Sequence, residues 1–576
     1  MKDTQIFQTN SVKRWRNYKW SFRVFLIILV FFIVVLGIAL FTGSNPSLPN
    51  LEEKSKVYQG KMDPSNPFTL SQKLNKKYKG FKDFLDKKIK EDSFKTPNKQ
   101  GVANQAPFIR AAFYSPWKGK AALTSLDKYG SNLNVIFPEW FFIDTITHTL
   151  QTRIDSIGLQ TMRAKALKIM PMLTNFNSAL GDFDGKLLHS IFNNNTQRQK
   201  FIQQIVDTLT HYGLQGINID FENINDNSNN PLTIFQKELY QSLHANGFTI
   251  TMDVAVKNDD YDYEKLSDYN DYIILMAYDQ FEKSTKPGPI CAQKWIEECV
   301  DWTVKKIDPK KIILGIAGYG YDWKTDEEGK IIADNISYTE AINRAQIKNA
   351  KIDFNNDNYN LNFTYIDEEK NSEGNIENIR HDIWFTDAAT TFNVMRFSDE
   401  YSTAGTALWL LGSEDARMWN FYQRDLSAEA LKKIPINFAP LSAIPIIPDN
   451  VGYDGEGEVL NIIASPQVGK VLIEIDTAEM LIAEQQYNQL PSGYIIQKFA
   501  EDTTKPGPGH KLILTFDDGP DPVWTPQILS ILEKEKVPAT FFIVGLQGEK
   551  NIPLLQRINK DGFEIGNHTF THKNVA

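Results

Sequence analysis

At 576 residues the chain is longer than one hydrophobic core usually supports, so we expect two or three domains. Its composition, 42% hydrophobic and 23% charged, is that of a folded protein. The net charge is −9 and no large basic block lies outside the N-terminus, which argues against a nucleic-acid-binding protein, because such proteins cluster Lys and Arg against phosphates.

The N-terminal region predicts a membrane anchor. An apolar run without a charge extends from Val24 to Phe41, close to the length that crosses a bilayer. Basic residues outnumber acidic ones before it, so the positive-inside rule makes residues 1–23 a cytoplasmic tail and everything downstream extracytoplasmic. We therefore expect a transmembrane helix over 24–42 and a location at the cell membrane, with a single span in this segment. A cleaved signal peptide is the alternative, although its hydrophobic region is usually shorter.

Residues 43–105 are polar and Lys-rich, which predicts a stalk, whereas residues 106–424 alternate short apolar runs with helical patterns. The predicted strands are Ile109–Tyr114, Leu133–Phe137, Lys168–Thr174, Gly216–Glu222, Thr249–Val256, Tyr272–Tyr278, Lys311–Gly318 and Thr406–Leu411. Eight buried strands with intervening helices favour the α/β class and a (β/α)8 TIM-type barrel. The long gap at about 322–402 predicts an insertion before the last strand. Only Cys291 and Cys299 are present, so one disulfide and two buried thiols are equally open.

The fourth predicted strand, Gly216–Glu222, carries the first cluster of candidate catalytic residues. Side chains alternate along a strand, so its apolar residues face the helices while Asn218, Asp220 and Glu222 face the barrel interior. Two neighbouring carboxylates disfavour double ionisation, which raises one pKa and yields a carboxylic acid near neutral pH. Such an acid can protonate a glycosidic oxygen, and Glu222 ends the strand where barrel active sites form. A solvated edge strand with ordinary charges is the alternative.

Three motifs in this region resemble those of glycoside hydrolase family 18, the chitinase-like barrels. The family signature D-G-x-D-x-D-x-E stands here as Q-G-I-N-I-D-F-E at 215–222, and its M-x-Y-D stands as M-A-Y-D at 276–279. Trp409 matches the tryptophan of the last strand. In addition, Pro138-Glu139-Trp140 and Trp384 resemble the members that process cell-wall or spore glycans.

The resemblance implies a role for each matching residue. Glu222 would be the acid/base and Asp220 its partner, while the N-acetyl carbonyl of the substrate serves as the nucleophile, so the barrel needs no cofactor. Tyr278 and Asp279 would orient the acetamide. The substrate-binding residues would be Trp409 (beneath the sugar ring), Asn218, Glu139, Met276 and Trp384. The motif departs from the family at Gln215 and Asn218, but the Asp220–Glu222 pair remains, so hydrolysis is expected.

Residues 425–505 are rich in Pro and β-formers and predict a β-rich connector. A new pattern begins in residues 506–576, where a predicted strand ends in D-D-G-P at 517–520 and H-T-F-T-H stands at 568–572. D-D-G-P by itself predicts only a turn. However, Asp with two His at positions i and i+4, which share a face if the segment is helical, is typical of a hydrolytic metal centre with open positions.

These two motifs resemble those of the polysaccharide deacetylase family, the NodB-homology domain. The resemblance implies that Asp518, His568 and His572 bind a divalent metal, usually zinc, and that Asp517 is the general base that helps remove an acetyl group from N-acetylglucosamine. It also implies the start of a second, distorted (β/α) barrel. Because the later motifs of that family are absent, we expect a fragment of a longer polypeptide or an inactive domain. Proteins of this arrangement often continue into a family 2 glycosyltransferase, which would be a further module or partner.

Both resemblances imply the same substrate class, β-linked glycans that carry N-acetyl groups. We expect a hydrolase that processes N-acetylglucosamine-containing polysaccharide at the cell surface, by chitinase-like hydrolysis and by metal-dependent N-deacetylation. Its partners would be the N-acetylated polysaccharide or oligosaccharide and the membrane, not nucleic acid. The alternative is a non-catalytic glycan-binding barrel that presents polymer to a deacetylase or synthase module.

Overall fold

The computed structural model describes residues 108–572 except 225–229, 356–357, 371–375, 448–450, 458, 477–479 and 500–512. The predicted cytoplasmic tail, transmembrane helix and stalk lie outside the described residues. Among the residues that are described, no helix combines the length and the apolar character needed to cross a bilayer. The described chain forms two units, one with residues 108–452 and 464–495, the other with residues 453–463 and 496–572.

The first unit contains a closed barrel of eight parallel strands. They are β1 (Ile109–Tyr114), β2 (Val135–Ile143), β5 (Met172–Thr174), β8 (Gly216–Asp220), β9 (Thr249–Ala255), β10 (Tyr272–Met276), β11 (Ile312–Ala317) and β17 (Gly405–Trp409). The strand order is β1-β17-β11-β10-β9-β8-β5-β2, and pairing of β1 with β2 closes the ring. Two short strands, β3 (Leu150–Thr152) and β4 (Lys168–Ile169), also pair with β2. The predicted (β/α)8 barrel is therefore confirmed.

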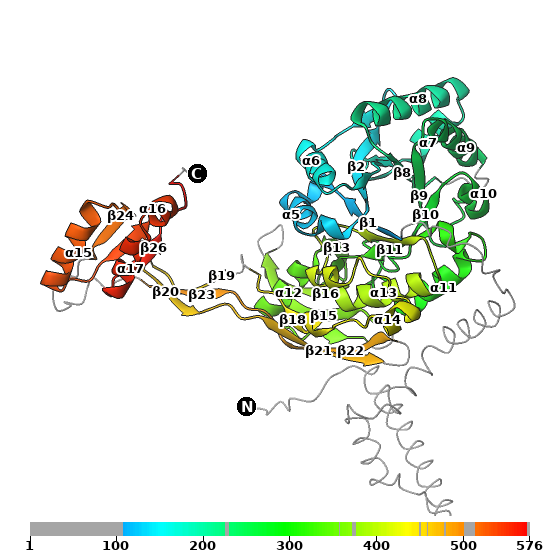
Figure 1. The fold of residues 1–576 in the computed structure, drawn as a ribbon. Helices are drawn as coiled ribbons and strands as arrows, with labels where there is room; N and C mark the ends of the chain where they lie inside the picture. The colour runs from blue at the N-terminus through cyan, green and yellow to red at the C-terminus, as the bar shows by residue number, and fades with distance from the viewer. Residues whose placement is uncertain are drawn as a thin grey trace, which may run out of the picture. The chain divides into compact units, whose positions relative to one another are not determined.

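Helices cover the outside of the barrel strands (Figure 1). They are α5 (Lys120–Tyr129), α6 (Ser156–Ala164), α7 (Gly185–Phe192), α8 (Asn195–Tyr212), α9 (Asn230–Ala245), α10 (Tyr263–Asp268), α11 (Gln293–Thr303) and α13 (Ala388–Glu400). Helix α8 shows why they form: the Asn194 side chain caps its first turn, and Gly213 ends it in the left-handed conformation. Between these caps, apolar residues at helical spacing pack against the strands. Cys291 and Cys299 are both buried free thiols.

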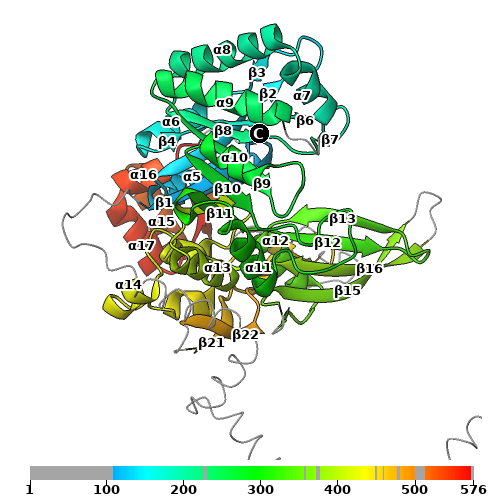
Figure 2. The same ribbon diagram turned by 90° about the vertical axis from the view of Figure 1, so that its right-hand side faces the viewer.

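An antiparallel sheet occupies the segment where the sequence predicts an insertion. Its strands are β12 (Gly320–Thr325), β13 (Ile331–Ile336), β14 (Asp353–Phe354), β15 (Leu361–Lys370) and β16 (Ile376–Phe385), in the order β13-β12-β16-β15-β14. Helix α12 (Tyr338–Ile347) begins with a capping box formed by Ser337 and Glu340. Figure 2 shows this sheet beside the barrel strands. A small hairpin of β6 (Phe176–Asn177) and β7 (Asp182–Phe183) follows β5.

The predicted connector consists mainly of β-strands. After helix α14 (Ala428–Lys433), the strands β18 (Ala443–Ile444), β21 (Gly469–Asp476) and β22 (Leu481–Gln489) form one sheet. The side chain of Asn393 in α13 pairs with both backbone groups of Ile482, which fastens β22 to the barrel. A second sheet contains β19 (Val451–Asp454), β23 (Tyr494–Phe499) and β20 (Val459–Ala464).

The C-terminal part of the second unit alternates strands and helices, as the sequence predicts. Its parallel strands are β24 (Thr515–Gly519), β25 (Thr540–Ile543) and β26 (Glu564–Asn567), and its helices are α15 (Trp524–Glu535), α16 (Gly545–Lys550) and α17 (Ile552–Lys560). A small apolar core joins the helices to the sheet through Leu529, Leu532, Phe541, Ile543 and Ile558.

Candidate active site

The carboxyl end of β8 brings two acidic residues to the centre of the barrel unit. Asn218 and Asp220 are buried, with Asp220 only 6% exposed. The alternating apolar residues Ile217, Ile219 and Phe221 belong to the hydrophobic core that also includes residues of α7, α8 and α9. Glu222 follows the strand and is half-buried. The side chain of Asn175 fixes the backbone of Glu222, accepting from its N–H at 3.0 Å and donating to its carbonyl oxygen at 2.9 Å.

The surroundings of these carboxyl groups favour their protonated forms. Burial raises the pKa of Asp220 to about 7, opposed by a hydrogen bond from Thr174 and assisted by the charge of Glu139. Burial also raises the pKa of Glu222 well above its usual range, and the charges of Asp220 and Asp279 raise it further. The pair therefore meets the requirement for a carboxylic acid that keeps its proton near neutral pH.

Asp253 in β9 is an acidic neighbour of this pair that the sequence analysis did not identify. It is 2% exposed and accepts a hydrogen bond from the Asn218 amide at 2.6 Å, while the Thr251 hydroxyl donates to the Asn218 carbonyl oxygen at 2.6 Å. Burial and the charges of Asp220 and Glu222 raise the pKa of Asp253 well above its usual range. Asn218 thus connects β8 to a third buried carboxyl group.

The segment after β10 contributes Tyr278 and Asp279. Asp279 accepts hydrogen bonds from the hydroxyls of Tyr319 and Tyr321, two residues that the motifs did not point to. Burial raises the pKa of Asp279 to about 6. The Tyr278 ring lies so close to β11 that a Cβ at Gly315 would stand 2.8 Å from Tyr278 Cε1. The Tyr278 ring thus lies directly against the backbone of Gly315, which limits the movement of the ring on that side.

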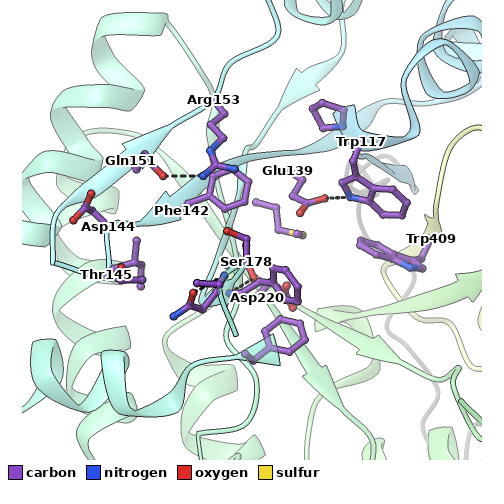
Figure 3. Close-up of a pocket in the computed structure, with 18 residues that line it drawn as sticks. Trp117, Glu139, Phe142, Asp144, Thr145, Gln151, Arg153, Ser178, Asp220 and Trp409 are labelled. Atoms are coloured by element: carbon purple, nitrogen blue, oxygen red, sulfur yellow. Dashed lines mark hydrogen bonds between the residues drawn. The ribbon is translucent and has the colours of Figure 1, made fainter. Parts of the chain in front are cut away.

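A cavity of about 750 Å³ opens beside these residues (Figure 3). Of the predicted site residues, Glu139, Asp220 and Trp409 line it. The Trp409 ring packs edge-on against Phe113 in the barrel interior, with 5.1 Å between ring centroids. Trp117, which is 60% exposed, donates from its indole N–H to Glu139 at 2.7 Å. Two indole rings at one end of the cavity suit the apolar faces of sugar rings.

The structure places two other predicted substrate-binding residues away from the wall of this cavity. Met276 is the half-buried last residue of β10. Trp384 lies in β16 and is partly buried against the large core of the barrel. A substrate-binding role for either residue stays a prediction.

The raised pKa of Asp220 predicts that the barrel loses stability as the pH rises. The folded protein holds this proton up to about pH 7, whereas the ordinary pKa of the group is 3.8. Between these values the folded state binds more protons than the unfolded state, so the free energy of unfolding falls with rising pH. We expect Asp220→Asn to gain on the order of 2 kcal/mol of stability relative to the wild type between about pH 5 and about pH 8. Urea denaturation at both pH values measures this gain, and an equal difference at both would contradict it.

In the second unit, Asp518, His568 and His572 come together as the sequence predicts. His568 Nε2 and His572 Nε2 lie 3.2 Å and 3.1 Å from Asp518 Oδ1, and the three potential ligand atoms all lie within 4.8 Å of one another. The segment that carries the two histidines is a bent turn after β26 and not a helix, so the helical condition placed on the pair is not met. Positive φ angles at Thr569 and His572 turn the chain and bring the rings to a 5.0 Å centroid separation. Asp517 is exposed in β24, beside Asp518.

Two family models match the chain. The model described as glycosyl hydrolases family 18 matches residues 110–414, more than half of the chain. The model described as polysaccharide deacetylase matches residues 504–576. The two matches lie in the same order as the two resemblances noted in the sequence.

Three known proteins are similar to parts of this chain. The uncharacterized glycosylase YvbX of Bacillus subtilis is 27% identical over 308 residues, which cover 52% of this chain and 86% of YvbX. The cortical fragment-lytic enzyme of Bacillus anthracis is 25% identical over 260 residues, which cover 43% of this chain and 58% of that enzyme. A peptidoglycan-N-acetylglucosamine deacetylase of Bacillus cereus is 42% identical over 83 residues, which cover 14% of this chain and 36% of the deacetylase. The chain therefore spans less than two thirds of the length of the last two relatives.

Proposed function

Because the chain belongs to glycosyl hydrolases family 18, we propose that its barrel hydrolyses β-linked polymers of N-acetylglucosamine, with Glu222 as the acid/base. The observation that carries this proposal is the Asp220–Glu222 pair at the carboxyl end of β8, with Asp220 buried and Glu222 half-buried, beside a cavity whose wall includes Trp409. An acid whose pKa is raised in this way keeps a proton to donate near neutral pH.

The proposed mechanism uses the acetamide of the substrate as the nucleophile. Glu222 donates its proton to the glycosidic oxygen while the bond to the anomeric carbon breaks, and the acetamide carbonyl oxygen attacks that carbon from the opposite face. Water then opens the cyclic ion, and the Glu222 carboxylate takes up the proton that this water loses. Asp220 stabilises the positive charge that develops on the acetamide, and Tyr278 and Asp279 orient this group.

For residues 504–576 we propose a part in metal-dependent N-deacetylation. Asp518, His568 and His572 would hold a divalent cation, and two His nitrogens with one carboxylate oxygen are a ligand set that suits zinc. A bound ion of this kind supplies Lewis-acid chemistry. Asp517 would act as the general base and hold the proton on its carboxylate. The convergence of the three ligand atoms supports this proposal.

The names of two relatives bear on which polymer is the substrate. One is named for cortical fragments and another for peptidoglycan, so we propose a glycan of the peptidoglycan kind in addition to plain N-acetylglucosamine oligomers. Mass spectrometry of both glycans after incubation with the chain tests hydrolysis and acetyl loss. Shortened chains support the glycosidase. Intact, fully acetylated chains in both cases would favour the alternative, a glycan-binding barrel without catalysis.

Anchoring by residues 24–42 is a further proposal, which rests on their apolar, uncharged character and on the basic residues before them. We expect the full chain in the membrane fraction of cells and a chain that begins at residue 43 outside it. Equal partition of both chains would contradict the anchor. A family 2 glycosyltransferase as a further module or partner stays a prediction.

A further inference from the structure

The wall of the barrel cavity includes a positively charged side chain that takes no part in the proposed reaction. Among the described residues that line the cavity, Arg153 is the only one with a cationic side chain. It follows β3, and its backbone N–H donates to the carbonyl oxygen of Trp140 at 2.8 Å. Its guanidinium lies over the Phe142 ring, 4.6 Å from the centroid, and donates to Gln151 at 3.2 Å. These contacts hold an exposed arginine in place.

Two of the carboxylates that line the cavity together with Arg153 accept hydrogen bonds from other groups. Asp144 accepts hydrogen bonds from the backbone N–H groups of Ile146 and Thr147 and from the Thr147 hydroxyl, and these bonds lower the pKa of Asp144. Glu139 accepts from Trp117. Among the described residues, no carboxylate oxygen lies within ion-pair distance of the Arg153 guanidinium. The N–H donors of the Arg153 guanidinium are therefore available to a ligand.

Arg153 stands at the opposite end of the cavity from the tryptophans. Figure 3 shows Arg153, Gln151 and Asp144 on one side, Trp117 and Trp409 on the other, and Glu139 and Asp220 between them. Burial raises the pKa of Glu139, which lies between the two ends, and the charge of Arg153 opposes that rise. A glycan that stacks one sugar on Trp409 can therefore bring a neighbouring sugar to Arg153.

We propose that Arg153 binds a carboxylate on the substrate. The barrel would then prefer N-acetylated chains in which a sugar near the cleaved bond carries a carboxylic acid attached through an ether oxygen, as in the lactyl group of muramic acid. A planar guanidinium binds a carboxylate through two parallel hydrogen bonds, a geometry that a neutral hydroxyl cannot reproduce. An ether-linked acid is favoured over a uronic acid, because the sugar that carries it keeps the acetamide used in the proposed reaction. This inference rests on the proposed glycosidase function.

The test compares two glycans of equal length on the full chain: N-acetylglucosamine oligomers, and peptide-free strands in which alternate sugars carry lactyl groups. Strands whose lactyl carboxyl is converted to an amide are the matched control. We expect Arg153→Gln to lower kcat/KM for the lactyl strands by about tenfold, mainly through KM, and to leave the neutral oligomers unchanged. Arg153→Lys should recover part of the loss, because lysine keeps the positive charge but lacks the paired N–H donors of the guanidinium. High salt should reduce the preference of the wild type.

Two outcomes would overturn the inference. One is an equal loss on lactyl and neutral glycans, which would make Arg153 a structural residue; the other is no loss on either. If the wild type cleaves neither glycan, the proposed glycosidase function fails, and calorimetric binding of the same glycans to wild type and Arg153→Gln still decides the inference. A preference for the lactyl strand that Arg153→Gln abolishes supports it, and equal affinities in both proteins contradict it.

Discussion

Replacing Glu222 by Gln should reduce the hydrolysis of N-acetylglucosamine oligomers by about 10²–10⁴-fold while their binding survives. The amide has nearly the same shape as the carboxyl group but cannot donate a proton to the glycosidic oxygen. The contacts of Asn175 with the Glu222 backbone do not involve the side chain, so the variant should keep its local structure. Mass spectrometry of the products gives the rate, and calorimetry gives the affinity.

The matched control for this variant is Glu264→Gln, the same chemical change on an exposed residue of α10. It should hydrolyse the oligomers at the wild-type rate. If Glu222→Gln also remains as active as the wild type, another group is the acid and the proposed mechanism is wrong. If the wild type binds the oligomers but never shortens them, the barrel is a binding module.

Removing one histidine from the second unit should abolish tight metal binding. Wild-type protein should bind one zinc ion per chain at Asp518, His568 and His572. His572→Ala should weaken the zinc affinity by more than about 100-fold, because mutating residues that only hydrogen-bond to metal ligands already costs about 10–100-fold. Acidification should release the ion, because metal ligands must be deprotonated to bind. Zinc titration followed by calorimetry measures the affinity, and atomic emission measures the stoichiometry.

His211→Ala provides the control, because it removes an exposed histidine of α8 outside the ligand cluster. This variant should bind zinc as the wild type does. Unchanged zinc affinity in His572→Ala would show that the ion, if any, is held elsewhere. A loss of zinc binding together with a loss of the helical circular-dichroism signal would indicate unfolding. His572→Gln, whose side chain is closer in size to histidine, then separates the loss of a ligand from unfolding.

Much of the fold follows from local patterns in the sequence. The eight barrel strands are short apolar runs separated by amphipathic helices, and burial on both faces leaves that pattern wherever a parallel sheet is covered by helices. Alternation along β8 likewise placed Asp220 inside the barrel and its apolar neighbours outside. The candidate metal ligands could be predicted because each lies within a short motif. These features depend on residues close together in the chain.

The partners of the site residues were decided by the tertiary structure alone. Asp253 reaches Asn218 from a position 35 residues away, and Tyr319 reaches Asp279 across 40 residues. Arg153 lines the cavity because it directly follows the short strand β3, and no sequence motif includes this residue. The two histidines share a ligand cluster through a turn with positive φ angles, where the sequence allowed a helix. The amino-acid sequence by itself determined which residues are candidates for the chemistry and which segments are buried, because hydrophobic spacing and motif chemistry are local. Which carboxyl groups crowd together, and hence how far each pKa is raised, depended on barrel closure, because only closure brings distant strands within reach of one another's charges.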